Sequence, residues 1–262
     1  MRLTSVHARI TVVAILAATF FLGFVGTAIA GPRVVATTPW TAAFAMAAGV
    51  DADDIHVLAP YEMQHPPEYE LRATDVALIG DADFVIFAGY EAMMERLRRA
   101  VDGEGPVLIQ IRTDHRLSTI TASVMAIAEA AGTVAVARQN IAQIDAFLSD
   151  WRASVPPAAR ELRVITHAVQ QAILAELQIP VVATFGPGPL QARQIGELTA
   201  ADPELVVDVW HNRSAAPLRE TIPGAVFVEL INFPGRDGTR TLMDVLRHKR
   251  AELDRAIAAA LE

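Results

Sequence analysis

Short apolar runs rich in β-branched residues alternate with amphipathic stretches along most of this chain. The apolar runs lie at residues 33–36, 55–59, 84–87, 107–111, 162–165, 181–185, 205–209 and 226–230. Stretches with helical periodicity separate them, and strands that alternate with helices are typical of βαβ units and parallel sheets. The sequence therefore predicts an α/β fold with two similar series of strands, one before residue 112 and one after residue 161.

Residues 133–157 separate the two series. Apolar side chains recur there at helical spacing, at Ile141, Ile144, Leu148 and Trp151. The pair Pro156-Pro157 ends the pattern, because proline cannot continue a helix interior. We therefore predict two lobes, residues 31–132 and 158–262, each with a parallel sheet flanked by helices, and a single long helix that joins them.

The first thirty residues have the pattern of a secretory signal. Arg2 and Arg9 precede an apolar run that begins at Ile10. The segment ends in Ala28-Ile29-Ala30, the pattern that a signal peptidase cleaves. An uncleaved membrane anchor is the alternative, since residues 10–30 are just long enough to span a bilayer. We expect residues 1–30 to be a cleaved signal peptide and the mature protein to be periplasmic.

Composition excludes several classes of function. The chain of 262 residues has no cysteine, which rules out a disulfide scaffold, an iron–sulfur cluster and a thiol nucleophile. It also rules out a lipid-modified N-terminal cysteine. The net charge of -8, with no basic block, argues against nucleic-acid binding.

Four histidines follow predicted strands, two in each lobe: His65, His115, His167 and His211. Ligands bind beyond the carboxyl ends of parallel strands, and neutral imidazole suits zinc and other transition metals. A single histidine there is more often a helix cap or a surface residue, so the prediction of a metal site depends on the joint pattern. His56, within a strand, and His248, within the last helix, are expected to be structural or exposed.

A carboxylate is a further candidate ligand. Asp237 lies in the predicted loop 232–238, after the last strand. Aspartate before glycine is most often turn chemistry, which is the alternative reading of Asp237-Gly238. Histidine protonation competes with metal, so we expect binding to weaken below about pH 6.5, the unperturbed pKa.

Four segments in order carry a family pattern. They are MQHPPEYELRATDVALIGDADFVIFAGYE (63–91), VITHAVQQAILAELQIPVVATFGP (164–187), LVVDVWHNRSAAPLRE (205–220) and GTRTLMDVLRHKRAEL (238–253). With a connecting helix between the first and second segments, the chain resembles the metal-binding solute-binding proteins of ABC transporters, the periplasmic receptors for zinc, manganese or iron. The resemblance covers nearly the whole chain after residue 30.

The resemblance implies a metal site in the cleft between the lobes. His65 matches the family's first-lobe histidine and His167 its second-lobe histidine, while His115 lies where a second first-lobe ligand is expected. Asp237 corresponds loosely to an acidic fourth ligand. The chain departs from the family because His65 lies two residues upstream of the usual position and the surroundings of His115 do not match. His211 is therefore an alternative for the second or the fourth ligand.

The implied function is capture of a divalent metal ion and its delivery to an ABC permease, by a monomer that is not an enzyme. Three or more histidine ligands favour zinc, and a carboxylate ligand makes manganese or iron plausible. Two alternatives remain open besides a structural or adhesin role. One is a receptor for a metal chelate such as a siderophore or a corrinoid, and the other is a periplasmic zinc hydrolase, for which the sequence has no H-E-x-x-H signature.

Overall fold

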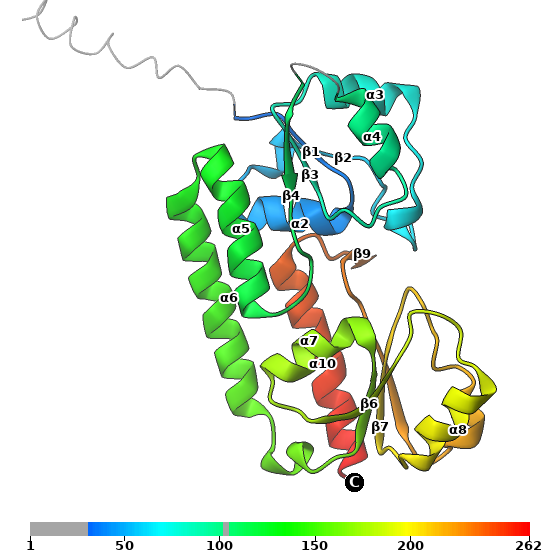
Figure 1. Cartoon of the computed structure of the whole chain (residues 1–262). Coiled ribbons are helices and arrows are strands. Elements are labelled where there is room, and N and C mark those ends of the chain that lie inside the picture. Colours follow the sequence, from blue (N-terminus) through cyan, green and yellow to red (C-terminus); the bar gives the residue numbers. More distant parts are fainter. Residues whose placement is uncertain (1–30, 102–104) are drawn as a thin grey trace, which may run out of the picture. The chain divides into compact units, whose positions relative to one another are not determined.

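The computed structural model describes residues 31–101 and 105–262, so the predicted signal peptide lies outside the described residues. Pro32–Glu262 forms one compact unit. Two parallel four-stranded sheets lie within it, one in each half of the sequence (Figure 1). The predicted α/β fold with two lobes is therefore confirmed.

All strand pairs within the two sheets are parallel. The first sheet has the order β2 (Ile55–Val57), β1 (Val34–Ala36), β3 (Phe84–Phe87) and β4 (Val107–Gln110). The second has the order β6 (Val181–Phe185), β5 (Val164–His167), β7 (Leu205–Val209) and β8 (Val226–Leu230). The two orders are equivalent, so each lobe repeats one topology.

Helices cover both faces of each sheet. Those in the first half are α2 (Pro39–Ala47), α3 (Ala73–Gly80), α4 (Met94–Ala100) and α5 (Leu117–Ala131). The others are α6 (Val134–Ser154), α7 (Gln171–Glu176), α8 (Ala192–Ala200), α9 (Leu218–Thr221) and α10 (Leu242–Ala260). Among the helices that the structure describes, none is long and apolar enough to cross a bilayer.

Successive residues of each strand face opposite layers, as the pleat requires. In the first sheet, Val35 and Val85 pack in one core with residues of α3 and α4, while Val34 and Ile86 pack in another with α2 and α5. The second of these cores continues into the other sheet and includes α6 and α10. One continuous core therefore joins the two lobes behind the cleft.

The long helix α6 occupies the predicted connecting segment and lies beside α5 (Figure 1). Its buried side chains include Ile144, Leu148 and Trp151, three of the four that define the helical pattern. The indole Nε1 of Trp151 donates a hydrogen bond to Asp254 Oδ1 of α10 at 2.7 Å. The connecting helix is thus attached to the last helix of the chain as well as to its neighbours in sequence.

Two boundaries near the predicted site differ from the sequence prediction. Strand β5 continues to His167, which was expected two residues beyond the strand end. A short strand, β9 (Pro234–Asp237), occupies part of the segment predicted to be a loop. Both differences concern candidate ligands, because His167 is the last residue of β5 and Asp237 is the last residue of β9.

Candidate metal centre

The strand orders define where a ligand is expected. In each sheet the connections run in opposite directions from the first strand, so the switch points lie between β1 and β3 and between β5 and β7. In the second lobe, His167 ends β5 and His211 follows β7 by two residues. Two of the predicted ligands therefore lie at a topological switch point, where open parallel sheets bind ligands.

In the first lobe, aromatic residues rather than histidines follow the two strands at the switch point. Trp40 follows β1 and Tyr90 follows β3, whereas His65 and His115 follow the outer strands β2 and β4. Trp40 is held at the start of α2, where the side chain of Thr38 caps the helix. Two aromatic side chains therefore occupy the central positions of this lobe, and its histidines flank them.

A buried carboxylate fixes the loop that carries Tyr90. Glu91 accepts hydrogen bonds from the backbone N–H groups of Ala88 at 2.8 Å and Gly89 at 2.6 Å. It also accepts one from the hydroxyl of Thr37, which follows β1, at 2.6 Å. The loops after β1 and β3 are thereby joined to each other, which positions Trp40 and Tyr90 on the same side of the sheet edge.

These elements enclose a cleft of about 560 Å³. Its lining comes from both lobes: Trp40, His65, Pro67, Glu68, Tyr90, Thr113, Asp114, Arg116, Ala168, Val169, Gln171, Ala172, Pro187, His211, Asn212, Asn232 and Phe233. Two of the predicted ligands, His65 and His211, line it directly. His115 and His167 lie behind its surface, and each is adjacent in sequence to residues that do line it.

His65 and His211 approach each other across the lobes. Their ring centroids are 6.1 Å apart, with the rings nearly perpendicular. Phe233 packs against His211 at a centroid distance of 4.9 Å. The side-chain amide of Gln64 donates to the backbone carbonyl of His211 at 3.4 Å. The two loops that carry these histidines are therefore already in contact.

His115 is buried against the indole of Trp40. The rings are stacked with centroids 5.5 Å apart and an angle of 25° between their planes. Neither ring nitrogen of His115 has a hydrogen-bond partner among the described residues. This stacking could not be predicted from the sequence, because Trp40 and His115 follow different strands.

His167 is held by the turn that follows it. Its Nδ1 accepts a hydrogen bond from the backbone N–H of Val169 at 3.3 Å, so the neutral ring carries its proton on Nε2. Gly186 packs directly against Nε2, and its φ of 78° lies in the left-handed region. Metal binding at Nε2 therefore requires the ring to release Val169 and exchange its tautomer.

Gly186→Ala tests whether this close packing positions His167. The added Cβ would overlap the imidazole, and a left-handed φ disfavours an L side chain. We expect the variant to lose about 1–3 kcal/mol of unfolding free energy in denaturant titrations and to bind metal more weakly. Gly188→Ala is the matched control, because no atom lies within 4 Å of its added Cβ. Equal effects at both positions would show that the packing is unimportant.

Buried polar atoms without partners gather around the cleft. Seven buried side-chain atoms of the described residues have no hydrogen-bond partner. Six of them belong to residues at this site: Trp40 Nε1, His115 Nδ1 and Nε2, His167 Nε2, His211 Nδ1 and Asn232 Oδ1. Buried polar atoms are normally bonded, and imidazole nitrogen is a preferred ligand of transition metals. The chemistry of this donor set fits a metal ion.

The donors are not yet assembled into a coordination shell. Within residues 31–101 and 105–262, no three histidine, aspartate or glutamate side chains are placed so that they could hold one ion. Metal binding through these histidines therefore requires side chains, or the loops that carry them, to move closer together.

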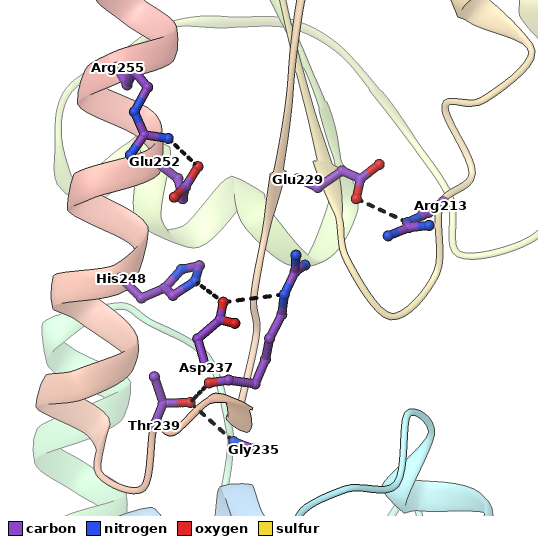
Figure 2. Close-up of polar contacts among 9 residues, drawn as sticks. Arg213, Glu229, Gly235, Asp237, Thr239, His248, Glu252 and Arg255 are labelled. Atoms are coloured by element: carbon purple, nitrogen blue, oxygen red, sulfur yellow. Dashed lines mark hydrogen bonds and ion pairs between the residues drawn. The ribbon is translucent and has the colours of Figure 1, made fainter.

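Asp237 points toward His248 of α10 (Figure 2) and is not among the residues that line the cleft. Its Oδ2 lies 3.0 Å from Nε2 of His248 on α10 and 3.4 Å from the guanidinium of Arg236. Its φ of 53° is left-handed, as expected for aspartate before glycine. His248, expected to be structural or exposed, is the partner of Asp237, which makes turn chemistry the better account of Asp237 in this structure.

Burial lowers the pKa values of three of the candidate histidines. It lowers the pKa of His167 to about 4, and that of His211 also to about 4, with smaller contributions from His65, His167 and Lys249. Burial, followed by the charge of Lys249, holds the pKa of His115 well below 6.5. These rings are neutral at pH 7, so protons compete for His167 and His211 near pH 4 rather than near the expected pH 6.5.

A lysine that the sequence prediction overlooked lies behind the histidines. Lys249, the one lysine of the chain, is fully buried on α10. Its Nζ donates a hydrogen bond to Oε1 of Gln170, and Nε2 of Gln170 donates to the carbonyl of Leu230 at 3.3 Å. Burial lowers the pKa of Lys249 well below 10.5. Because Gln170 belongs to the turn that follows His167, α10 supports that turn.

Comparison with solved structures identifies the fold. The SBP FpvC from Pseudomonas aeruginosa in complex with Mn²⁺ has a TM-score of 0.70 and 19% identity, over 88% of this chain and 99% of that chain. The periplasmic zinc binding protein TroA from Treponema pallidum has a TM-score of 0.62 and 18% identity, over 88% and 99%. A periplasmic metal binding protein from Candidatus Liberibacter asiaticus has 0.67 and 13%, over 86% and 98%.

At these identities the similarity establishes the fold alone, a two-lobed α/β fold that this chain shares with these proteins. It extends over nearly the whole length of each neighbour. The sequence itself matches no protein-family model and no curated protein sequence.

Proposed function

We propose that this protein captures a divalent transition-metal ion in the cleft between its lobes and delivers it to an ABC permease. The observation that carries the proposal is the group of unpartnered imidazole nitrogens on His115, His167 and His211, which surround a cleft at a topological switch point. The neighbours of the same fold, described as binding manganese or zinc, support the same function.

The proposed ligands are His65 and His115 from the first lobe, and His167 and His211 from the second. Because the ligands come from both lobes, the ion would link them, and binding would draw the loops of His65 and His211 together. The hydrogen bond from Gln64 to the carbonyl of His211 already connects these loops. The low pKa values of the buried rings keep them in the neutral form that binds metal.

Zinc is the ion that we propose first. Four neutral imidazoles match its preference for nitrogen ligands in a tetrahedral shell. Asp237 is engaged by His248, and its use as a ligand would require that contact to break. If Asp237 does enter the site, manganese or iron becomes the better candidate, since carboxylate oxygen suits these ions.

The remaining features of the proposal follow from the sequence and from the fold. We propose that residues 1–30 form a cleaved signal peptide and that the mature protein acts as a periplasmic monomer without enzymatic activity. Residues 31–132 and 158–262 are proposed as the two lobes, with residues 133–157 as the connection. The acidic chain offers charge complementarity to a cation.

Thermal melts of the purified, metal-free protein test the function. Zinc, manganese and ferrous iron are added separately, and a bound ion at about 100 times its dissociation constant should stabilise the fold by roughly 2.7 kcal/mol. We expect zinc to give the largest shift, and magnesium serves as a control because it prefers oxygen ligands. Absence of a shift with all three transition metals would contradict the proposed function.

A further inference from the structure

The segment that follows β8 contacts loops of both lobes. We call residues 233–240 the bridging segment; it contains β9 and ends just before α10. By sequence it belongs to the second lobe. Its first residue, Phe233, packs against Trp40 of the first lobe at a centroid distance of 6.3 Å and against His211 of the second at 4.9 Å. The bridging segment therefore reaches both lobes at its first residue.

Two further residues of the bridging segment contact Tyr61, which lies in the first-lobe loop that carries His65. The guanidinium of Arg240 lies over the ring of Tyr61, 4.1 Å from its centroid. Gly235 packs so closely against the backbone carbonyl oxygen of Tyr61 that a Cβ at this position would overlap it. The φ of Gly235, 132°, also favours glycine. Both contacts cross from the second lobe to the first.

Arg236 makes the corresponding contact in the second lobe. Its guanidinium lies over the ring of Trp210, 5.0 Å from the centroid, and Trp210 immediately precedes His211. A cation within about 6 Å of the centroid of an aromatic ring is attracted to the ring face. The two arginines of the bridging segment therefore contact aromatic residues of two different ligand-bearing loops.

Hydrogen bonds within the bridging segment hold its residues together (Figure 2). The backbone N–H of Gly235 donates to the hydroxyl oxygen of Thr239 at 3.1 Å, and that hydroxyl donates to the carbonyl of Arg236 at 2.7 Å. Oδ2 of Asp237 lies 3.0 Å from Nε2 of His248, which attaches the segment to α10. The bridging segment therefore connects the two loops as one unit.

We propose that the bridging segment sets the separation of the two ligand-bearing loops, with Arg236 and Arg240 as positioning residues for the metal site. The direct contact between these loops is slight, since the hydrogen bond from Gln64 to the carbonyl of His211 is 3.4 Å long and exposed. Ligands that are already held near their bound positions lose less conformational freedom on binding, so the affinity is higher. This inference rests on the proposed function.

Zinc affinities of Arg236→Gln, Arg240→Gln and the double variant, measured by isothermal titration, test the proposal. A connection with two ends is lost when either end is released. All three proteins should therefore lose affinity to a similar extent, about threefold to tenfold, as expected for a lost cation–π contact. Independent effects at the two loops would make the loss in the double variant the product of the single losses. That product, or wild-type affinity in both single variants, would overturn the proposal.

Arg219→Gln is the matched control. Arg219 lies over the ring of Phe227 at 4.5 Å, a cation–π contact of similar length outside the bridging segment. Glu229, which Arg219 approaches at 3.8 Å, keeps Arg213 as a closer partner at 3.0 Å. This variant should bind zinc as the wild type does. A loss equal to that of Arg236→Gln would show that the effect is not specific to the bridging segment and would overturn the proposal.

Hydrogen exchange in the metal-free protein separates the bridging role from the proposed function. Arg240→Gln should speed amide exchange in residues 210–214, the loop at the other end of the segment, and Arg236→Gln should speed it in residues 61–65. Faster exchange only in the loop that loses its own contact would overturn the proposal. If exchange is faster at the far loops but the wild type binds neither zinc, manganese nor iron, the bridging segment still sets the separation of the loops and the proposed function is contradicted.

Discussion

His211→Ala should weaken zinc binding by at least about 100-fold. Its ring centroid lies 6.1 Å from that of His65, and its buried Nδ1 has no hydrogen-bond partner among the described residues. Loss of groups that merely support a metal ligand costs 10- to 100-fold, so loss of a ligand itself should cost at least as much. Isothermal titration of zinc into metal-free protein measures the change.

His56→Ala is the control for this variant, because His56 is an exposed residue of β2 on the first sheet. It should bind zinc as the wild type does. The metal-free unfolding transition of His211→Ala should also be measured, so that loss of binding is not confused with loss of the fold. Zinc affinity that is unchanged in a folded His211→Ala protein would remove His211 from the site.

Lys249→Met should change how the unfolding free energy depends on pH. The pKa of Lys249 lies well below 10.5 in the folded protein, so the unfolded chain binds this proton more tightly. Stability of the wild type therefore rises with pH from the folded pKa up to about 10.5, by up to about 1.4 kcal/mol per pH unit. Methionine of similar length carries no proton, and this rise should be absent in the variant.

Urea titrations of both proteins between pH 7 and pH 10 check this prediction. The unfolding free energy of the variant minus that of the wild type should fall as the pH rises, because only the wild type gains stability from Lys249. The other titrating groups are present in both proteins, so their contributions cancel. Arg247→Met, at an exposed position of the same helix, should leave the wild-type profile unchanged. Parallel profiles for Lys249→Met and wild type would show that Lys249 keeps an ordinary pKa.

Much of the fold was predictable because its strands are buried β-branched runs bounded by polar residues. The predicted bounds of Phe84–Phe87, Val181–Phe185, Leu205–Val209 and Val226–Leu230 match the structure. Strand β9 was not predictable, since its sequence Pro-Gly-Arg-Asp has neither alternation nor β-branched residues. Its conformation depends on contacts made elsewhere in the chain, such as Arg236 over the ring of Trp210 at 5.0 Å.

The candidate site was predictable in part for a similar reason. The strand ends indicated that His65 and His211 would meet if the two lobes face each other, because each parallel sheet directs its carboxyl ends to one edge. The pairing of Asp237 with His248 could not be predicted from the sequence, since it depends on how α10 packs beside β9. Lys249, by contrast, could have been found from spacing: it shares the apolar face of α10 with Val245, Leu246 and Leu253.

The burial of the other two candidate ligands, His115 and His167, could not be predicted from the sequence. His115 is covered by Trp40, and His167 by Gly186, through contacts between segments far apart in the chain. That burial lowers their pKa values and therefore moves proton competition to lower pH than the unperturbed value indicates.

Equilibrium dialysis followed by a direct count of metal per chain tests the central claim, that histidines of both lobes bind one ion. Metal-free protein is dialysed against buffered zinc, and the bound zinc is measured by elemental mass spectrometry. We predict one zinc ion per chain for the wild type and for His56→Ala, and none for the double variant His65→Ala/His167→Ala, which lacks one ligand in each lobe. Zinc retained by a folded double variant, or absent from the wild type, would contradict it.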